Sequence, residues 1–236
     1  PSQRSVGTPL GLSWAASAML SNHFTLESKG DESLFLDGQT DALTLSLRYG
    51  LPNQWDVNVI VPWRHHYGGF TDNLISSWHR FFGLPDGNRD SYPTDALHYQ
   101  LSQPEHDRRL IRSASGLGDI HVAVSRPVLA IDGGQLGISV GVKTASGQAA
   151  DWLGTGATDV YALLRFSGQE LGGWPLWWHG QVGGTRAGDS DLLGPEQKRS
   201  LWFAGLAAEW RFTPRWSALI QYDGHSALLD GALEAL

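Results

Sequence analysis

The chain has 236 residues, enough for one domain, and carries a formal net charge of −7 without a run of basic residues. Nucleic acid is therefore excluded as an expected partner, because binding it requires a basic surface. The absence of cysteine excludes disulfides and thiol chemistry. No stretch approaches the ~18 consecutive apolar residues of a membrane-spanning helix, so any passage through a membrane must be made by strands of a closed barrel.

The first two predicted strands cover residues 12–27 and 33–49. Along the first strand, apolar and polar residues alternate, which is typical of a strand with one apolar and one polar face. Along the second strand, the apolar positions change parity between Leu34 and Leu43. We expect a β-bulge near Gly38, because one inserted residue would restore a single apolar face.

Residues 55–63 show the clearest alternation. The apolar face comprises Trp55, Val57, Val59, Val61 and Trp63. Its two tryptophans are separated by about 26 Å along a strand, or roughly 20 Å across a bilayer if the strand is tilted by ~40°. This length approaches the apolar band of about 25 Å in transmembrane barrels, and tryptophan favours the boundary between hydrocarbon and water. The sequence therefore predicts a membrane-crossing strand.

The stretch 64–116 is predicted to be a long extracellular loop with one short amphipathic helix near 71–82. Thr71 is a suitable N-cap residue, and Gly83 and Pro85 are stop signals. The remainder of the stretch is polar and rich in turn-forming residues. Loops of this length in compact proteins are commonly functional or disordered.

Six further strands follow this loop, again with apolar residues on one face. They are expected over residues 120–125, 136–143, 159–166, 176–182, 202–212 and 216–223.

Short and long connections alternate along the chain, which is typical of barrels with short periplasmic turns and longer outside loops. The predicted fold is all-β, an antiparallel up-and-down transmembrane β-barrel formed by a single domain, residues 1–236. About nine strands are expected in this chain. Because bacterial barrels have even strand numbers, we expect the domain to be incomplete at its C-terminus and to have about twelve strands when intact.

Tryptophans near strand ends are expected to form an aromatic girdle at the two membrane surfaces. These are Trp14, Trp55, Trp63, Trp178, Trp202, Trp210 and Trp216. The alternative is a soluble lipocalin-like or lectin-like β-domain, in which the apolar face would point inward.

Four segments carry a resemblance to a known family: residues 68–87, 116–119, 154–159 and 221–226. They are similar to a family of Gram-negative envelope proteins catalogued as domain of unknown function 3187, and the similarity extends over nearly the whole chain. The resemblance implies an envelope location and a barrel fold. It implies no functional residues, because the family has no assigned activity.

Charged and polar residues on the inward faces of the predicted strands are candidates for lining a lumen. They are Asp56, Asn58, Asp119, His121, Lys143, Asp159, Arg165, His179, Glu209, Arg211 and Asp223. These residues could line a path for solutes. The favoured interpretation is a plugged interior in which opposite charges neutralise each other, because a narrow barrel fills easily with side chains.

Two further groups are candidate sites. Asp223 and His225 lie two residues apart, on one face at the predicted outer rim beside Ser226, and a hydrolase could orient a histidine in this way. No nucleophile motif accompanies this weak catalytic candidate. His65 and His66 could bind a metal ion, but neighbours in a strand point to opposite faces, which argues against a shared ligand. No cofactor or metal is expected.

The predicted helix has an aromatic stripe, made of Phe70, Leu74, Ile75, Trp78, Phe81 and Phe82. Such stripes are usually packed against the protein itself. Two alternatives are a lid over the entrance for an apolar ligand, and a helix lying on the outer leaflet with its stripe buried.

The leading functional hypothesis is a non-enzymatic passive channel or carrier in the bacterial outer membrane. Its expected partners are the lipid bilayer and small solutes, apolar solutes included. The alternatives are a structural or surface-binding barrel with a plugged lumen, and an outer-membrane hydrolase.

Overall fold

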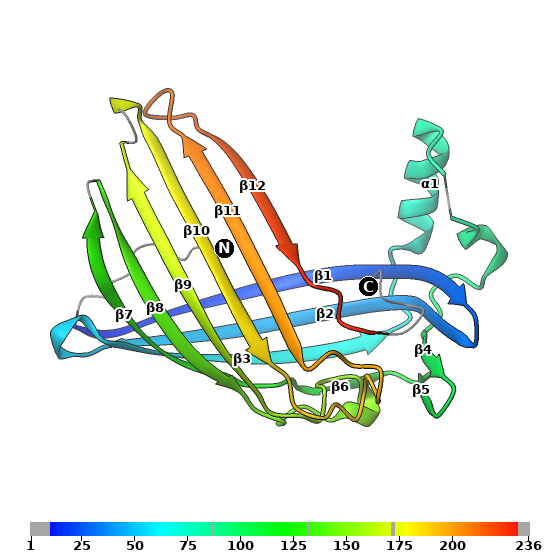
Figure 1. Cartoon of the computed structure of the whole chain (residues 1–236). Helices are drawn as coiled ribbons and strands as arrows, with labels where there is room; N and C mark the ends of the chain where they lie inside the picture. Colours follow the sequence, from blue (N-terminus) through cyan, green and yellow to red (C-terminus); the bar gives the residue numbers. More distant parts are fainter. Residues whose placement is uncertain (1–9, 86, 132, 171–172, 231–236) are drawn as a thin grey trace.

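A computed structural model describes residues 10–85, 87–131, 133–170 and 173–230, within which twelve strands form one antiparallel sheet (Figure 1). The predicted all-β, antiparallel class is confirmed. Residues 1–9 and 231–236 of the predicted domain lie outside the described part. Among the described residues, no helix has both the length and the apolar character needed to cross a membrane.

Nine strands are long, and they correspond to the nine predicted from the sequence. Their bounds are β1 (Gly11–Lys29), β2 (Glu32–Gly50), β3 (Asp56–Tyr67), β7 (His121–Ile131), β8 (Gly134–Lys143), β9 (Asp159–Gln169), β10 (Leu176–Arg186), β11 (Ser200–Trp210) and β12 (Ala218–His225).

The segment predicted as a long loop is more structured than expected. Strand β3 continues to Tyr67, and three short strands follow the helix: β4 (His98–Gln103), β5 (His106–Leu110) and β6 (Ala114–Leu117). Strand β4 pairs with the first half of β2, and β6 pairs with the end of β3. The prediction of one loop over 64–116 was therefore wrong, because β4 and β6 pair with strands distant in sequence and β5 pairs with β4.

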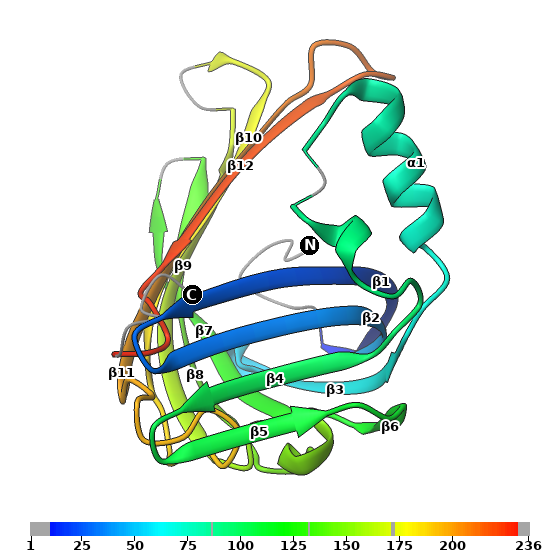
Figure 2. The same ribbon diagram turned by 90° about the vertical axis from the view of Figure 1, so that its right-hand side faces the viewer.

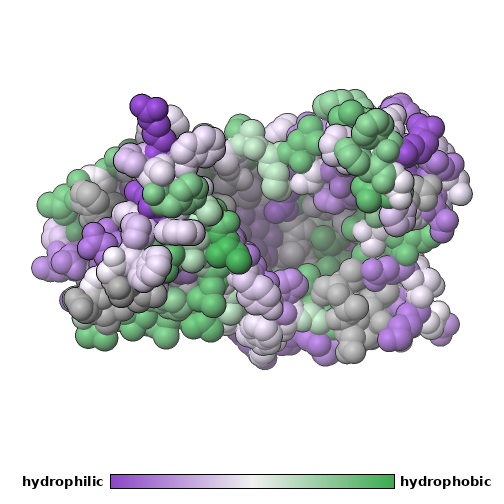
Figure 3. All heavy atoms as spheres, turned by 90° about the horizontal axis from the view of Figure 1, so that it is seen from above, coloured by the Kyte–Doolittle hydropathy of each residue, from purple (hydrophilic) through white to green (hydrophobic). Residues whose placement is uncertain are grey.

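The sheet is strongly curved and open (Figures 1 and 2). Its long strands follow the order β12-β11-β10-β9-β8-β7-β3-β2-β1, so that β1 and β12 are unclosed edges within the described residues. We call the end with the segments 68–120, 144–158 and 187–199 the loop end, and the opposite end, with its short links, the turn end. Seen from above, the molecule is hollowed, with hydrophilic residues in the depth of the hollow (Figure 3).

One face of the long strands is apolar although it is exposed. In the register of the sheet, Val124 of β7 pairs with Val57 of β3 on one side and with Val140 of β8 on the other. Val140 pairs with Ala162 of β9, and Leu164 is the next residue of β9 on the same outward face. We call the exposed outward residues the apolar band: Leu12, Trp14, Leu20, Leu43, Leu45, Trp63, Val124, Val140, Val160, Leu164, Val182, Trp202, Leu206, Trp210, Ile220 and Tyr222. Polar residues such as Asp56 and Ser139 occupy the opposite, concave face and are buried.

The two faces exchange character along β2. Its pairing with β1 runs without a shift from Ser33 to Gly50, so Leu34 and Leu43 point to opposite faces. The expected bulge at Gly38 is wrong, although this residue has a φ of 145° and an added Cβ would lie 2.8 Å from Leu97 Cδ1. A glycine is needed there for its backbone and its close contact, and it does not shift the register.

The parity change instead places apolar residues where the loops can cover them. Leu34, Leu101 and Leu229 form a buried cluster, and Trp152 and Leu193 from the long loops pack against it. Before about residue 40, towards the loop end, β2 is therefore apolar on the side that the loops cover.

The helix α1 (Asp72–Phe82) occurs where the sequence predicts it. Gly83 ends it in the left-handed conformation, with a φ of 67°. Thr71 holds the N-cap position but makes no capping hydrogen bond; its hydroxyl donates to Gln39 Oε1 at 3.1 Å. Thr71 thus attaches the helix to β2.

We expect Leu101→Ala to lower the free energy of unfolding by about 2–5 kcal/mol, because the side chain is buried and its loss leaves a cavity. Denaturant titration of the protein in detergent measures the change. The matched control is Leu84→Ala at an exposed site, which should alter stability by no more than about 0.5 kcal/mol. Equal effects of the two substitutions would contradict a loop-end core.

Candidate functional site

A charged cluster on the concave face, which we call the central cluster, joins the turn ends of β2 and β3 to β9. Arg48 donates from Nη2 to Asp56 Oδ2 at 2.7 Å, and the Asp56 side chain is almost fully buried. Arg165, from β9, interacts electrostatically with both. Arg48 Nε, Asp56 Oδ1 and Arg165 Nε are buried and lack a hydrogen-bond partner among the described residues. Buried polar atoms are normally hydrogen-bonded, so this cluster fits a wet surface better than a dry core.

A second charged network fixes the loop end. Lys143, the last residue of β8, lies 2.8 Å from Asp119 Oδ2 and 3.2 Å from Asp159 Oδ2. The Asp119 carboxylate also accepts the backbone N–H of Gly147 at 2.9 Å. Because all three side chains are mostly buried, the network ties the loop 144–158 to the ends of β8 and β9.

The pKa of Asp119 reflects two opposing effects. Burial by itself would raise the pKa of this carboxyl, but hydrogen bonds from Lys143 and from the backbone N–H groups of Thr155 and Gly147 outweigh burial, and the pKa is lowered. The ionised carboxylate therefore stabilises the folded loop at every pH above the unfolded value of 3.8. That contribution is lost only as the pH falls through the lowered pKa.

A third cluster surrounds the Thr40 hydroxyl, beyond the end of the apolar band. Thr40 Oγ1 lies 2.8 Å from His66 Nδ1, 3.1 Å from Tyr99 Oη and 3.1 Å from His23 Nε2. His66 Nε2 in turn bonds the carbonyl of Trp152 at 3.1 Å. A hydroxyl beside an oriented histidine occurs in hydrolases. Here the hydroxyl is buried and shared by three neighbours, so the cluster connects strands to a loop.

Burial controls the titration of this third cluster. It raises the pKa of Tyr99 to about 12 and lowers the pKa of both His23 and His66. Because the folded protein resists protonation of the two histidines, their contribution to stability is complete above the unfolded pKa of 6.5. It declines as the pH falls below that value.

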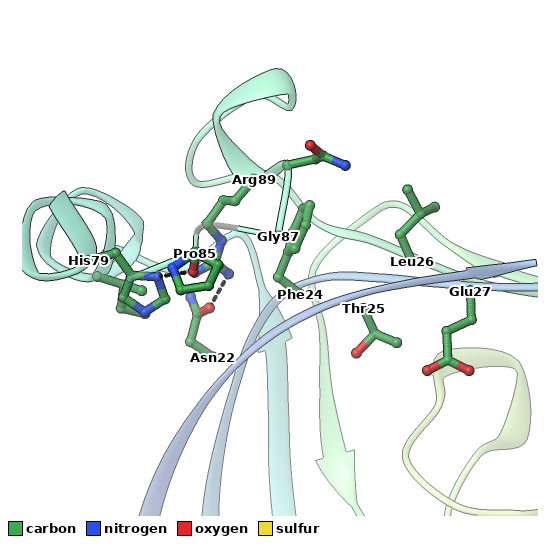
Figure 4. A pocket seen from close by; sticks show the side chains of 11 residues that line it. Asn22, Phe24, Thr25, Leu26, Glu27, His79, Pro85, Gly87 and Arg89 are labelled. Carbon is green, nitrogen blue, oxygen red and sulfur yellow. Dashed lines mark hydrogen bonds between the residues drawn. The ribbon is translucent and has the colours of Figure 1, made fainter. Parts of the chain in front are cut away.

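A pocket of about 610 Å³ lies between α1 and β1 at the loop end (Figure 4). Arg89 lines it and donates to Asn22 Oδ1 and, at 3.3 Å, to the His23 carbonyl. The Arg89 guanidinium lies over the Phe24 ring, with 5.1 Å between its Cζ atom and the ring centroid. His79 of α1 contacts the carbonyl of Pro85 at 2.9 Å. The pocket therefore has a polar, internally paired wall and an aromatic floor.

The candidate lumen residues separate into groups. Asp56 and Arg165 belong to the central cluster, while Asp119, Lys143 and Asp159 form the loop-end network. The remaining candidates take other places: Asn58 in β3, His121 at the start of β7 with its ring 6.2 Å from that of Tyr161, His179 in β10, Glu209 and Arg211 joined at 2.9 Å at the turn end, and Asp223 in the edge strand β12. The structure thus brings together five of the predicted residues in two clusters.

The candidate girdle residues lie on the outward side. Trp14, Trp55, Trp63, Trp202, Trp210 and Trp216 are exposed, and Trp178 is half-buried. Within β3, Trp63 lies towards the loop end, and Trp55 directly precedes the strand at the turn end. A position at two membrane surfaces stays a prediction.

The weak catalytic candidates are not joined to each other. Both are described residues, and their hydrogen bonds go elsewhere: Asp223 Oδ2 accepts from Gln221 Nε2 at 2.6 Å, and His225 Nδ1 lies 2.8 Å from the Ser226 carbonyl. His65 and His66 point to opposite faces, as expected for neighbours. His65 stacks on Tyr67, whereas His66 contacts Thr40.

The aromatic stripe of α1 is mostly exposed, whereas such stripes are usually buried. Phe70, Leu74, Trp78, Phe81 and Phe82 are exposed, whereas Ile75 is half-buried and lines the pocket. The expectation that the stripe packs against the protein itself is therefore wrong for all of its members except Ile75. The physical reason is that polar groups of α1, above all Asp72, make the contacts to β1.

Sequence reasoning missed several residues that the structure brings into these clusters. Arg48 had a readable signal, because its parity places it on the polar face of β2, and the short turn after β2 sets it near Asp56. Thr40, Tyr99 and Arg89 gave no such signal. Their neighbours lie 17 to 67 residues away in sequence.

Comparison with known families gives one finding. The family described as "Protein of unknown function (DUF3187)" matches residues 3–234. No functionally curated protein matches the chain.

We expect Asp119→Asn to destabilise the loop end by about 3 kcal/mol, because it removes the charge that faces buried Lys143. Limited proteolysis within residues 144–158 measures the loss. The control is Asp151→Asn, in the same loop. It breaks an ion pair with the exposed Arg112, and such pairs contribute about 0–1 kcal/mol. Equal cleavage of the two variants would show that the network does not hold the loop.

Lowering the pH from 7.5 to 5 should destabilise the wild-type protein, because the unfolded chain takes up protons that His23 and His66 resist when folded. Thermal unfolding at a series of pH values measures this effect. In His66→Gln, the stability should depend less on pH over the same interval. An unchanged pH profile in that variant would exclude His66 as a cause.

Proposed function

This chain belongs to the DUF3187 family of proteins of unknown function, and we propose that it is an outer-membrane β-barrel that conducts or carries small solutes without catalysis. The apolar band carries the proposal. A soluble β-domain turns its apolar face inward, whereas here the outward apolar side chains of the long strands are exposed and polar ones such as Asp56 and Ser139 are buried on the concave face.

The exchange of faces along β2 supports a membrane boundary. Residues 43–49 of β2 are apolar on the outward face, and Leu34 and Leu36 are apolar on the opposite face. A strand that leaves lipid for water should change in this way, since its outward side chains then meet water and its inward side chains can pack. The boundary on β2 falls between Leu43, which pairs with Trp63 of β3, and Asp41, which pairs with His65.

A sheet in lipid must have no free edges, because unpaired backbone N–H and C=O groups are costly there. The proposal therefore requires that β1 and β12 be paired, by further strands of the protein or by a second copy. The short strands β4, β5 and β6 lie at the loop end and do not pair with β1 or β12. The described sheet therefore does not close these two edges.

The transported solutes are proposed to be small and polar. The central cluster of Arg48, Asp56 and Arg165 offers charges of both signs and buried polar atoms that need partners. Apolar solutes, which the sequence also suggested, would leave these atoms unsatisfied.

A second candidate is a barrel whose lumen is closed and whose loops bind a partner. The packing of Trp152 and Leu193 against Leu34 favours it, because long loops fold over the concave side at the loop end. The two candidates differ in whether solutes pass.

The membrane location predicts an asymmetric effect of adding charge. Val140→Arg, in the apolar band, should cost about 2 kcal/mol or more and reduce assembly in outer membranes, since a charge then faces lipid. Ile111→Arg is the control, at a site equally exposed but between β5 and β6. The assay is the yield of detergent-extractable, folded protein. A soluble protein would tolerate both changes.

Transport itself is tested with full-length protein in planar bilayers and in liposomes. We expect ion conductance and entry of small sugars, with larger conductance for Asp119→Asn, which loosens the loop 144–158. If the wild type is silent but Asp119→Asn conducts, the lumen is closed by its loops. If neither conducts nor admits solutes, the channel function is excluded.

A further inference from the structure

Helix α1 presents three different faces. One face contacts the protein and is polar: Asp72 Oδ1 accepts from Asn22 Nδ2 at 2.8 Å, and Asp72 Oδ2 accepts from the backbone N–H of Asp95 at 2.8 Å. His79 and Ser76 lie on the same face and are half-buried. The helix is therefore attached to the sheet by hydrogen bonds and leaves its apolar side chains free.

The second face is the exposed apolar stripe, and the third is exposed and polar. Leu74 is 69% exposed and Phe81 is 81% exposed, and the rings of Trp78 and Phe82 lie 4.5 Å apart on the same stripe. Residues of a helix are about 100° apart around its axis, so the three faces are separated by roughly 120° each. The third face comprises Asn73, Ser77 and Arg80.

A helix with three such faces fits a place where protein, lipid and water meet. On a purely aqueous surface, the apolar stripe would be exposed to water at a cost in free energy. Amphipathic helices at membrane surfaces instead bury their apolar face about 5–10 Å into the boundary between headgroups and acyl chains.

The attachment point of α1 lies at the matching height. Asn22 and Gln39 are paired across β1 and β2, and both bond Thr71 at the start of the helix. Leu20, two residues before Asn22, is the last exposed apolar residue of the band before this point. Two residues of strand correspond to about 7 Å, so α1 begins one headgroup layer beyond the apolar band. It also runs across the direction of β1 (Figures 1 and 2).

We propose that α1 lies in the headgroup layer of the bilayer leaflet at the loop end, with Leu74, Trp78, Phe81 and Phe82 inserted among the upper acyl chains. The inference rests on the membrane location proposed above. It assigns to this helix a lipid surface as its ligand.

Because the chain contains no cysteine, single cysteines can report the position of each face. The variants are Leu74→Cys on the apolar stripe, Asn73→Cys on the polar face and Val140→Cys in the apolar band. Each is labelled with an environment-sensitive fluorophore in the full-length protein, reconstituted into phosphatidylcholine–phosphatidylglycerol vesicles with or without lipids brominated near the glycerol end of their acyl chains.

We expect quenching by the brominated lipids to be at least about twofold greater at position 74 than at position 73, with position 140 also quenched. Quenching at 140 with equal, low values at 74 and 73 would overturn the inference and leave the membrane location intact. That pattern would point to a second copy or another protein as the partner of the stripe. An unquenched label at 140 would overturn the membrane location and the inference together.

Discussion

The structure depends on one constraint: in a strand with an unbroken register, successive side chains point to alternate faces of the sheet, so the sequence position of each residue fixes its face. In β2, the pairing continues without a shift past Gly38, and Leu34 and Leu43 are therefore fixed on opposite sides of the sheet. Each side must then meet an apolar environment, but at a different height. The long loops supply it for Leu34, and the outward face near Leu43 is left exposed. The exposed band and the covered cluster are two consequences of the same alternation.

This constraint also explains why the charges gather where they do. The outward face of the long strands is apolar, and polar groups such as Arg48 and Asp56 lie on the concave face and pair there. At the loop end, Lys143 faces both Asp119 and Asp159, and the paired charges hold a loop in place. Buried ion pairs contribute little to stability when compared with apolar packing, but removing one partner is costly. They therefore favour one loop conformation strongly.

Alternation and turn signals were enough to predict the long strands and α1, because both depend on residues close in sequence. Trp55–Trp63 and the stop at Gly83 are examples. The short strands β4 to β6 could not be predicted, since β4 and β6 pair with β2 and β3, more than 45 residues away, and β5 pairs with β4. The bulge expected at Gly38 failed for the same reason. From sequence, the only visible remedy for the parity change was a local one, whereas the structure uses distant loop residues such as Trp152.

The candidate site was predictable as a set of inward polar residues, but its division into clusters depends on which strands face each other across the hollow. Asp56 and Arg165 are more than 100 residues apart in sequence, and only the curvature of the sheet brings them together. Arg48 then completes a cluster in which each member keeps one buried atom without a protein partner. A sealed interior would be expected to satisfy these atoms internally, at the cost of rigid, fully paired charges. The polar atoms of the central cluster are incompletely paired, whereas Lys143 is fully paired with its neighbours. This arrangement supports the proposed wet passage behind a loop that is held in place.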